Sequence, residues 1–472
     1  MDRVGHILVD LAIILILILG IWRFRAPDTA RSGNFAASLA LLFALAWVFW
    51  TNSIREPATV VIALLAGGAV GYFVAVRVNM IQIPAMVAFQ HGAGGVAALL
   101  TSFVELTREG GNLSAVGELS GILGMVIGAA TFSGSMVASA KLAGFVHQPP
   151  IVLRSHNLIL AATMAGICVL GAMSLLSVGT VLYVGLLAIT LLAIELGAVF
   201  AMRIGGADMP VLISFLNATA GLAASFCGVI IQNRLLIACG ATVAASGSIL
   251  THVMCQAMNR RLSNVLVAAD LEKTNLVSPI NQAAVELPAP AAAVESAPSD
   301  NRSPLLRAAD AASEAATVII IPGYGMALAH AQFEVGKLAE RLKAMGKSVK
   351  FAIHPIAGRM PGHMHVLLAE ADVDSDILFD LPEINSEFRD ADLALVIGAC
   401  DVVNPAAIHV EGTPISGMPI LAAHEAKRVI VCNMDGKPGY SGVENPLYAD
   451  PRTILLFGDA KATLTQLLEA LS

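Results

Sequence analysis

A Gly-Tyr-Gly turn at residues 323–325 is the strongest chemical signal in the sequence. It follows the apolar run at 317–321 and precedes the small residues of a helix start. Glycines at such a turn let a pyrophosphate approach the backbone, and the N-terminal end of the helix attracts its charge. The third position of this dinucleotide-binding pattern is Leu328 instead of Gly, so an ordinary strand-to-helix turn remains the alternative. The candidate cofactor-binding residues here are Gly323, Tyr324, Gly325, Met326 and Ala327.

Positive charge follows this turn where a carboxylate would be expected. A fold specific for NAD places Asp or Glu about 20 residues beyond the glycines, on the ribose hydroxyls. No acid occurs between Glu340 and Glu370, whereas Arg and Lys do, so the pattern favours a 2′-phosphate and hence NADP. Arg359, in the loop IAGRMPG, is the best placed; the other cations also fit the solvated face of a helix. The cations are Arg341, Lys343, Lys347, Lys350 and Arg359, and the further candidate contacts are Ala357, Gly358 and Pro361.

A carboxylate follows the fourth apolar run of this region, in LVIGACDVVNPAA. Asp401 there stands beyond Gly398 and Ala399, at the carboxyl edge of the predicted sheet, where open α/β folds bind their ligands, and all three are candidate cofactor-binding residues. Its carboxylate can either cap a helix or titrate beside a cofactor. The residues alone favour neither interpretation.

Ionisable and polar residues inside apolar segments form a second group of candidates, because they are costly in a membrane. His91 and Asn217 each lie about 12–14 Å along their spans from the inner side, at about 1.5 Å per residue. With Ser246 and Ser248 they are candidates for a proton relay, since His changes charge near neutral pH. The alternative is that backbone carbonyls of neighbouring helices satisfy these groups. Two carboxylates are further candidates: Asp208, for which capping of the eighth span competes, and Glu195.

The composition shows what must position these residues. Of 472 residues, 56% are hydrophobic and 13% charged, whereas soluble proteins have about 45–50% apolar residues. The net charge of −7 is spread without tracts, which gives no sign of nucleic-acid binding, and the six cysteines show no metal or disulfide spacing. Windows long enough to span a bilayer predict nine transmembrane helices, at 6–22, 34–50, 57–76, 83–104, 119–142, 156–175, 178–201, 208–230 and 235–258.

The loops between the spans predict their orientation. The first span is expected to be an uncleaved anchor, because Arg23 and Arg25 follow its apolar run and no cleavage site appears. More basic residues fall on one side of the spans than on the other, which places the C-terminus inside. The richer side has Arg23, Arg25, Arg31, Arg77, Lys141, Arg154, Arg203, Arg260 and Arg261, and the poorer side Arg3, Arg55, Arg108 and Arg234.

The remaining chain divides into a linker and a soluble domain. Residues 1–258 form the predicted membrane domain, and the Pro- and Ala-rich segment 259–316 is too polar to pack, so we expect a flexible linker there. Beyond it, apolar runs alternate with helical stretches, which predicts a soluble doubly wound, Rossmann-like α/β domain at 317–472. The expected strands are 317–321, 349–354, 393–397, 428–432 and 453–457, and the expected helices include 328–345 and 460–471.

The whole chain except the linker resembles the beta subunit of the proton-translocating NAD(P) transhydrogenase family. Seven segments carry the resemblance: GGADMPVLISFLNATAG (205–221), SGSILTHVMCQAMNR (246–260), PGYGMALAHAQ (322–332), IHPIAGRMPGHMHVLLAEA (353–371), VIGACDVVNPAA (396–407), GYSGVENPLY (439–448) and LFGDAKA (456–462). The resemblance implies that 317–472 binds NADP(H) and that hydride passes directly between two nicotinamides while a proton crosses the membrane. It also implies an alpha subunit that carries NAD(H) and further membrane helices, a dimer of alpha-beta units, an inner-membrane location and a cytoplasmic C-terminal domain.

The resemblance also implies roles for individual residues. It ties His91, Asn217, Asp208, Ser246 and Gly247 to proton movement, and makes Asp401 the acid that couples protonation to cofactor affinity. It adds Asn433, Lys437, Tyr440, Gly458 and Asp459 to the cofactor-binding residues.

One departure concerns the 2′-phosphate. Where the family commonly has a Lys-Arg pair before its Gly-Tyr, this chain has Asn433 and Met434, and Lys437 is the nearest substitute.

Two other functional classes fit the architecture. One is a channel or transporter gated by a nucleotide-sensing domain, but the spans show no repeated half and the matching segments extend into the membrane part. The other is a membrane dehydrogenase with its own small substrate, which would need a catalytic base and a substrate domain that the sequence does not offer. The transhydrogenase interpretation is therefore favoured, with this chain inactive by itself.

Overall fold

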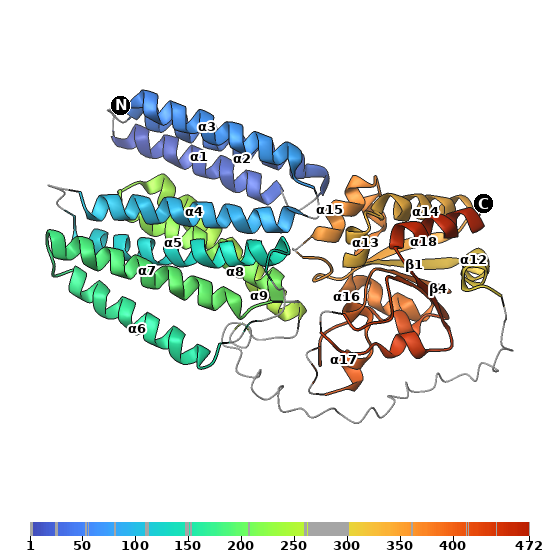
Figure 1. Ribbon diagram of the computed structural model, residues 1–472. Helices are drawn as coiled ribbons and strands as arrows, with labels where there is room; N and C mark the ends of the chain where they lie inside the picture. The colour runs from blue at the N-terminus through green and yellow to red at the C-terminus, as the bar shows by residue number, and fades with distance from the viewer. Residues whose placement is uncertain are drawn as a thin grey trace. The chain divides into compact units, whose positions relative to one another are not determined.

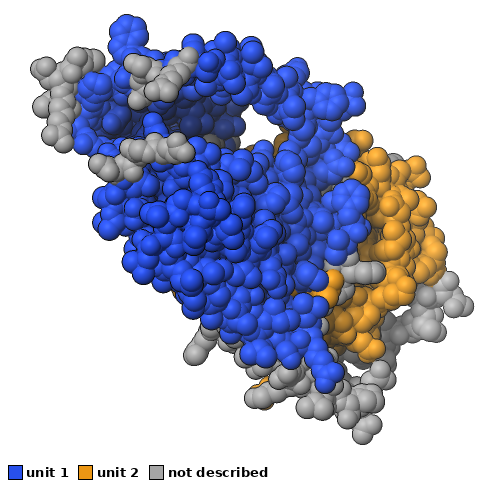
Figure 2. Space-filling view, turned by 60° about the vertical axis from the view of Figure 1, so that its left-hand side comes forward, with its two compact units in different colours: residues 1–147, 152–202, 213–249 blue, residues 148–151, 203–212, 250–472 orange. Residues whose placement is uncertain are grey.

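The computed structural model describes residues 3–23, 27–51, 54, 56–79, 82–108, 113–146, 151, 153–205, 208–258, 262, 302–359, 362–411, 413, 415–439 and 441–471. Two of the predicted cofactor residues, Pro361 and Tyr440, lie outside these ranges, as does most of the predicted linker. The chain forms two compact units, which Figure 2 distinguishes by colour. One unit comprises 1–147, 152–202 and 213–249, and the other 148–151, 203–212 and 250–472.

Nine helices in the described part of the chain are long and apolar enough to cross a membrane, as predicted. Each follows its predicted window within a few residues, apart from earlier starts such as that of α2. Their length and apolar composition indicate a multi-pass membrane protein. The helices are α1 (Arg3–Arg23), α2 (Pro27–Thr51), α3 (Pro57–Arg77), α4 (Ile83–Leu106), α5 (Ala115–Leu142), α6 (His156–Ser174), α7 (Thr180–Met202), α8 (Met209–Ile230) and α9 (Arg234–Ala257).

Glycines set the close packing between these helices. Helix α5 packs against α4 and α7, and Gly95 of α4 faces Gly128 of α5 so closely that a Cβ on either would lie 2.6 Å from the other's carbonyl oxygen. At the contact of α8 with α9, a Cβ on Gly247 would lie 2.7 Å from the amide nitrogen of Ala218. Small residues therefore let backbones approach where lipid supplies no hydrophobic force between helices.

The C-terminal region is built on a parallel sheet of six strands in the order β3-β2-β1-β4-β5-β6. This is the doubly wound order: strands β2 and β3 are added on one side of β1 and strands β4 to β6 on the other, so the strand order switches between β1 and β4. Five strands match the prediction, and the short β3 is the one that the sequence did not reveal. The strands are β1 (Thr317–Pro322), β2 (Ser348–Ile353), β3 (Leu378–Asp380), β4 (Leu393–Ile397), β5 (Arg428–Asn433) and β6 (Thr453–Phe457).

Helices cover both faces of this sheet, as Figure 1 shows for α14 and α18 on one face and α16 and α17 on the other. The second face holds a fully buried core in which alternate strand residues such as Ile321, Val396 and Val431 pack with Phe388. The remaining helices of the region are α12 (Pro304–Glu314), α13 (Tyr324–Leu328), α14 (Gln332–Ala344), α15 (His363–Glu370), α16 (Leu381–Ile384), α17 (Ala406–His409) and α18 (Ala460–Ala470), with short 3-10 turns η3 (Ser375–Ile377), η4 (Asn385–Arg389), η5 (Asp401–Val403), η6 (Ala423–Glu425) and η7 (Pro446–Ala449).

Two predicted boundaries are wrong. Helix α12 lies inside the segment predicted as linker, because its buried alanines, among them Ala308 and Ala312, pack against β6 and α18. The predicted helix 328–345 is interrupted, because His330 has a left-handed backbone (φ 51) that separates α13 from α14. The folded domain thus begins by Ser303, whose hydroxyl caps α12.

Candidate functional site

The Gly-Tyr-Gly turn follows β1, at the point where the strand order of the sheet switches from β1 to β4. The amide of Gly323 donates to the carbonyl of Ile397 and that of Gly325 to Gly398, both at 2.8 Å. A Cβ on Gly325 would lie 2.7 Å from the Cα of Gly398, which itself has φ 66. The missing side chains therefore let the loops after β1 and β4 touch. This packing accounts for the glycines, and their contact with a pyrophosphate stays a prediction.

Arg359 is the cation that the fold brings to this turn. Its guanidinium carbon lies 4.4 Å from the centre of the Tyr324 ring, a cation–π arrangement. Tyr324 is almost fully buried, and the centre of its ring lies 6.4 Å from the centre of the His363 ring. Sequence reasoning did not select His363, although its place four residues after Arg359 in the same loop was a usable signal.

Three of the other four cations have partners elsewhere. Arg341 donates to the carbonyl of Leu471 at 2.7 and 3.1 Å, and Lys347 to those of Ser313 and Ala315 at 2.6 and 2.7 Å. Lys350 pairs with Glu387 at 2.6 Å. Arg359 lies against the Gly-Tyr-Gly turn, so it stays the candidate for binding a phosphate there.

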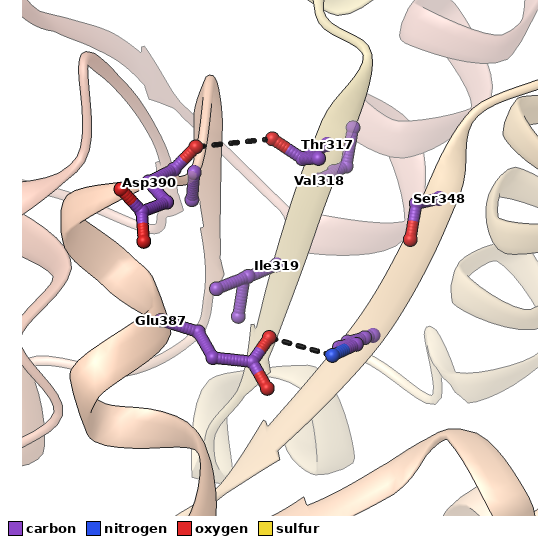
Figure 3. A pocket seen from close by; sticks show the side chains of 8 residues that line it. Thr317, Val318, Ile319, Ser348, Glu387 and Asp390 are labelled. Atoms are coloured by element: carbon purple, nitrogen blue, oxygen red, sulfur yellow. Dashed lines mark hydrogen bonds and ion pairs between the residues drawn. The ribbon is translucent and has the colours of Figure 1, made fainter.

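The Lys350–Glu387 pair lines a pocket of about 300 Å³ at the opposite strand ends. Figure 3 shows Thr317 and Ser348, the first residues of β1 and β2, on its wall, with the dashed pair below them. Ligands of doubly wound folds bind outside the carboxyl ends of the strands. This pocket is therefore distinct from the candidate dinucleotide site.

Asp401 tethers the segment that follows β5. Its Oδ1 accepts the hydroxyl of Ser441 at 2.6 Å and its Oδ2 accepts the amide of the same residue at 3.0 Å. A Cβ on Gly439 would lie 2.8 Å from both carboxylate oxygens, so only glycine fits there without displacement. Asp401 also begins the η5 turn. The carboxylate thus acts as a clasp between two loops at the carboxyl edge, and its titration stays a prediction.

Two asparagines strengthen the same junction. Asn404 donates to the carbonyls of Val443 and Glu444 at 3.4 and 3.1 Å, and Asn445 donates to that of Cys400 at 3.1 Å. Both side chains are almost fully buried. Segment 439–445 is therefore attached to the loop after β4 at three points.

Asn433 and Met434, which replace the family Lys-Arg pair, differ in their burial and contacts. Asn433 is buried and donates to the carbonyl of Ala399 at 2.9 Å and to the hydroxyl of Tyr448 at 2.6 Å. Met434 is 68% exposed. Lys437 is exposed and pairs with Asp435 at 3.0 Å, and this pair lowers the pKa of the Asp435 carboxyl. Asn433 is accounted for by packing, whereas Lys437 lies on the surface of the loop.

The last two predicted contacts lie at the end of β6. Gly458, with φ 147, donates its amide to the carbonyl of Asn433. Asp459 caps α18, since its Oδ1 accepts the amide of Ala462 at 3.0 Å. Among the other candidates, Met326 and Ala327 are buried in α13, and Ala357 and Ala399 are buried in the loops after β2 and β4.

In the membrane part, His91 lies on α4 where that helix packs against α5. Its Nδ1 is buried and, within the described ranges, has no hydrogen-bond partner. The neighbouring Gly92 lets α4 approach α5 closely, since a Cβ on Gly92 would lie 3.2 Å from the Cβ of Ser135. The hydroxyl of Ser135 is likewise buried and without a partner in the residues described.

The two serines among the predicted relay residues have other hydrogen bonds in this structure, and the joint role of the relay residues stays a prediction. In the described part of the chain, no hydrogen bond joins His91 to Asn217. Instead, Thr131 of α5 and Thr219 of α8 are hydrogen-bonded at 2.9 Å, which places a polar contact two residues from Asn217. The hydroxyls of Ser246 and Ser248 bond to backbone carbonyls of their own helix, at 3.0 and 2.7 Å.

The other membrane candidates are Gly247, Asp208 and Glu195, which lie on or beside three different helices. Gly247 is buried against Ala218, the residue after Asn217. Asp208 is half-buried and directly precedes α8, and Glu195 lies on α7. None of these positions assigns a role in proton movement.

Comparisons with known proteins agree with the fold over its whole length. The chain matches the family model described as the NAD(P) transhydrogenase beta subunit over residues 6–470. Two relatives, one from Rhodospirillum rubrum and one from a named strain of that species, are each 38% identical over 468 residues and are named NAD(P) transhydrogenase subunit beta. The match covers 97% of this chain and 97% of each relative. The chain therefore belongs to the NAD(P) transhydrogenase beta subunit family, whose enzymes act on nicotinamide dinucleotides and whose name implies an alpha subunit partner.

Proposed function

We propose that this subunit binds NADP(H) at the carboxyl edge of its sheet and takes part in hydride transfer with NAD(H) held by the alpha subunit. The observation that carries the proposal is the position of Arg359 over Tyr324, in a segment where the nearest acids are Glu340 and Glu370. A guanidinium suits a 2′-phosphate, because its planar fork of donors matches the phosphate oxygens. A bound nicotinamide dinucleotide would supply the hydride chemistry, and this chain would bind and orient it.

The residues present fit such a cofactor. The backbone of the Gly-Tyr-Gly turn, the Arg359 guanidinium and the Asp401 clasp come from three loops at one edge of the sheet. Asp401 holds Ser441 beside the site, so release of this clasp would open one wall. Lys437, which precedes Ser441 in the connection after β5, is an additional cation for the 2′-phosphate once its pair with Asp435 opens.

Proton coupling is the second part of the proposal. Protonation near His91 on α4 would change the contacts of the neighbouring helices and favour an open state of the nucleotide domain over an occluded one. The buried Nδ1 of His91 and the buried hydroxyl of Ser135, which have no hydrogen-bond partner among the described residues, support this, since polar groups inside a membrane bundle are costly and are retained for function. The same proposal places the subunit in the cell's inner membrane, its C-terminal domain in the cytoplasm, and two alpha-beta units in a dimer.

Reconstitution tests the coupling. The complex with its alpha subunit is placed in sealed liposomes, NADPH and NAD⁺ are added outside, and internal pH is followed with a trapped dye together with nucleotide absorbance. We expect hydride transfer to change the internal pH, a proton ionophore to accelerate it, and His91→Asn to slow both processes together. Hydride transfer without any pH change in the unmodified complex would contradict the coupling.

A further inference from the structure

His363 is a buried histidine whose packing involves the candidate site. It is 1% exposed and begins α15, directly after Gly362, which has a left-handed backbone (φ 74). Its Nδ1 accepts the backbone amide of Arg359 at 3.2 Å. The imidazole thus fixes the backbone from which the guanidinium extends.

The neighbouring loop is shaped around this imidazole. Gly358 has φ 103, and a Cβ there would lie 2.5 Å from the Nδ1 of His363. The residue before Arg359 must therefore be glycine both for its backbone angle and for the space that the ring occupies. The ring also approaches Tyr324, the side chain that carries the guanidinium on its face.

The chemical state of the ring follows from these contacts. Because Nδ1 accepts an N–H, the neutral ring has its proton on Nε2. Burial, and secondarily the charge of Arg359, lower the pKa of His363 to about 4, so the acceptor persists at neutral pH. Its Nε2 is buried, and within the ranges described it has no hydrogen-bond partner. An unsatisfied buried donor reduces stability, so an apolar residue of similar size would serve the core better than His.

We infer that His363 is a positioning residue that holds Arg359 over Tyr324 and thereby sets the preference for a 2′-phosphorylated dinucleotide. The inference rests on the proposed NADP(H) site. It explains why a polar ring occupies an apolar position, which packing alone does not.

The test is a double-mutant cycle in the full-length chain, with NADPH and NADH affinities measured by calorimetry. His363→Leu keeps the bulk and removes the acceptor, whereas in His363→Asn the side-chain oxygen takes the place of Nδ1. The loss of one hydrogen bond corresponds to about 3- to 10-fold weaker NADPH binding for His363→Leu, with NADH binding unchanged and most of the loss restored in His363→Asn. Arg359→Gln removes the guanidinium, and His365→Leu, on the same helix, is the matched control.

The cycle separates positioning from a structural role. If His363 acts through Arg359, the Arg359→Gln and His363→Leu double variant binds NADPH no more weakly than Arg359→Gln alone. Equal weakening of NADPH and NADH, or additive losses, would overturn the inference and leave the NADP(H) site standing. If Arg359→Gln leaves NADPH affinity unchanged, the 2′-phosphate assignment fails, and the inference fails with it.

Discussion

The clasp between Asp401 and Ser441 gives a prediction whose size follows from its two hydrogen bonds. In Asp401→Asn, one carbonyl oxygen replaces two carboxylate oxygens, so one of the bonds to Ser441 is lost and the other becomes neutral. Hydrogen bonds to charged groups contribute about 1.5–3 kcal/mol, and neutral ones about 1 kcal/mol. The two bonds to the carboxylate contribute about 3–6 kcal/mol together and the remaining neutral bond about 1 kcal/mol, so the tether of Ser441 should weaken by about 2–5 kcal/mol, which raises the population of the released state at least about 30-fold.

Amide hydrogen exchange of the full-length chain measures this release directly. Peptides covering residues 441–448 should exchange faster in Asp401→Asn by about that factor, because local opening sets the rate. Ser441→Ala should act in the same direction but more weakly, since it removes only the hydroxyl bond and leaves the backbone amide donating to the carboxylate. Asp435→Asn is the control. It removes the exposed ion pair between Asp435 and Lys437 and should change the exchange of these peptides little. Unchanged exchange in Asp401→Asn would refute the clasp.

Three further predictions concern the C-terminal domain. His354 is buried, its ring bonded to the carbonyl of Pro419 and the amide of Ile356, and burial lowers its pKa to about 4. The imidazole of the unfolded chain titrates near pH 6.5, so the contribution of the neutral His354 ring to the free energy of unfolding is complete above that pH. This contribution is lost between about pH 6.5 and 4, by up to about 3 kcal/mol, and the loss is measured as faster amide hydrogen exchange of β2. Gly398→Ala should destabilise the domain by at least about 2 kcal/mol, because the added Cβ meets the backbone of Gly325 at 2.5 Å in a left-handed conformation; an unchanged unfolding temperature would contradict this. Asn433→Lys should destabilise by about 3 kcal/mol, because it buries an unpaired ammonium, whereas the exposed Met434→Arg should retain stability and tighten NADPH; the reverse ranking would show that Asn433 faces the phosphate.

Much of the architecture was predictable because its signals are long and repeated. Nine apolar windows and five apolar strands persist over enough residues to dominate the pattern. Strand β3 was missed because three half-exposed residues, LFD, have no such pattern. Helix α12 was read as linker because its alanines are weakly hydrophobic in sequence, yet they fit closely against β6 and α18.

The candidate site was predictable in its residue types but not in its contacts. The position of Arg359 followed from charge, but its support by His363 depends on the left-handed turns at Gly358 and Gly362, which depend on tertiary contacts. Ser441 was likewise invisible, because the loops that it joins to Asp401 are 40 residues apart in the chain. Residues whose roles depend on loop conformation were the ones that sequence reasoning could not select.

Binding of the two nucleotides to the unmodified full-length chain tests the central claim most directly. Calorimetric titration with NADPH and with NADH, in the absence of the alpha subunit, compares ligands that differ only in the 2′-phosphate. A charge-assisted contact with Arg359 predicts that NADPH binds about 10- to 100-fold more tightly than NADH. Equal affinities, or no binding of either nucleotide, would contradict the assignment of the NADP(H) site to this subunit.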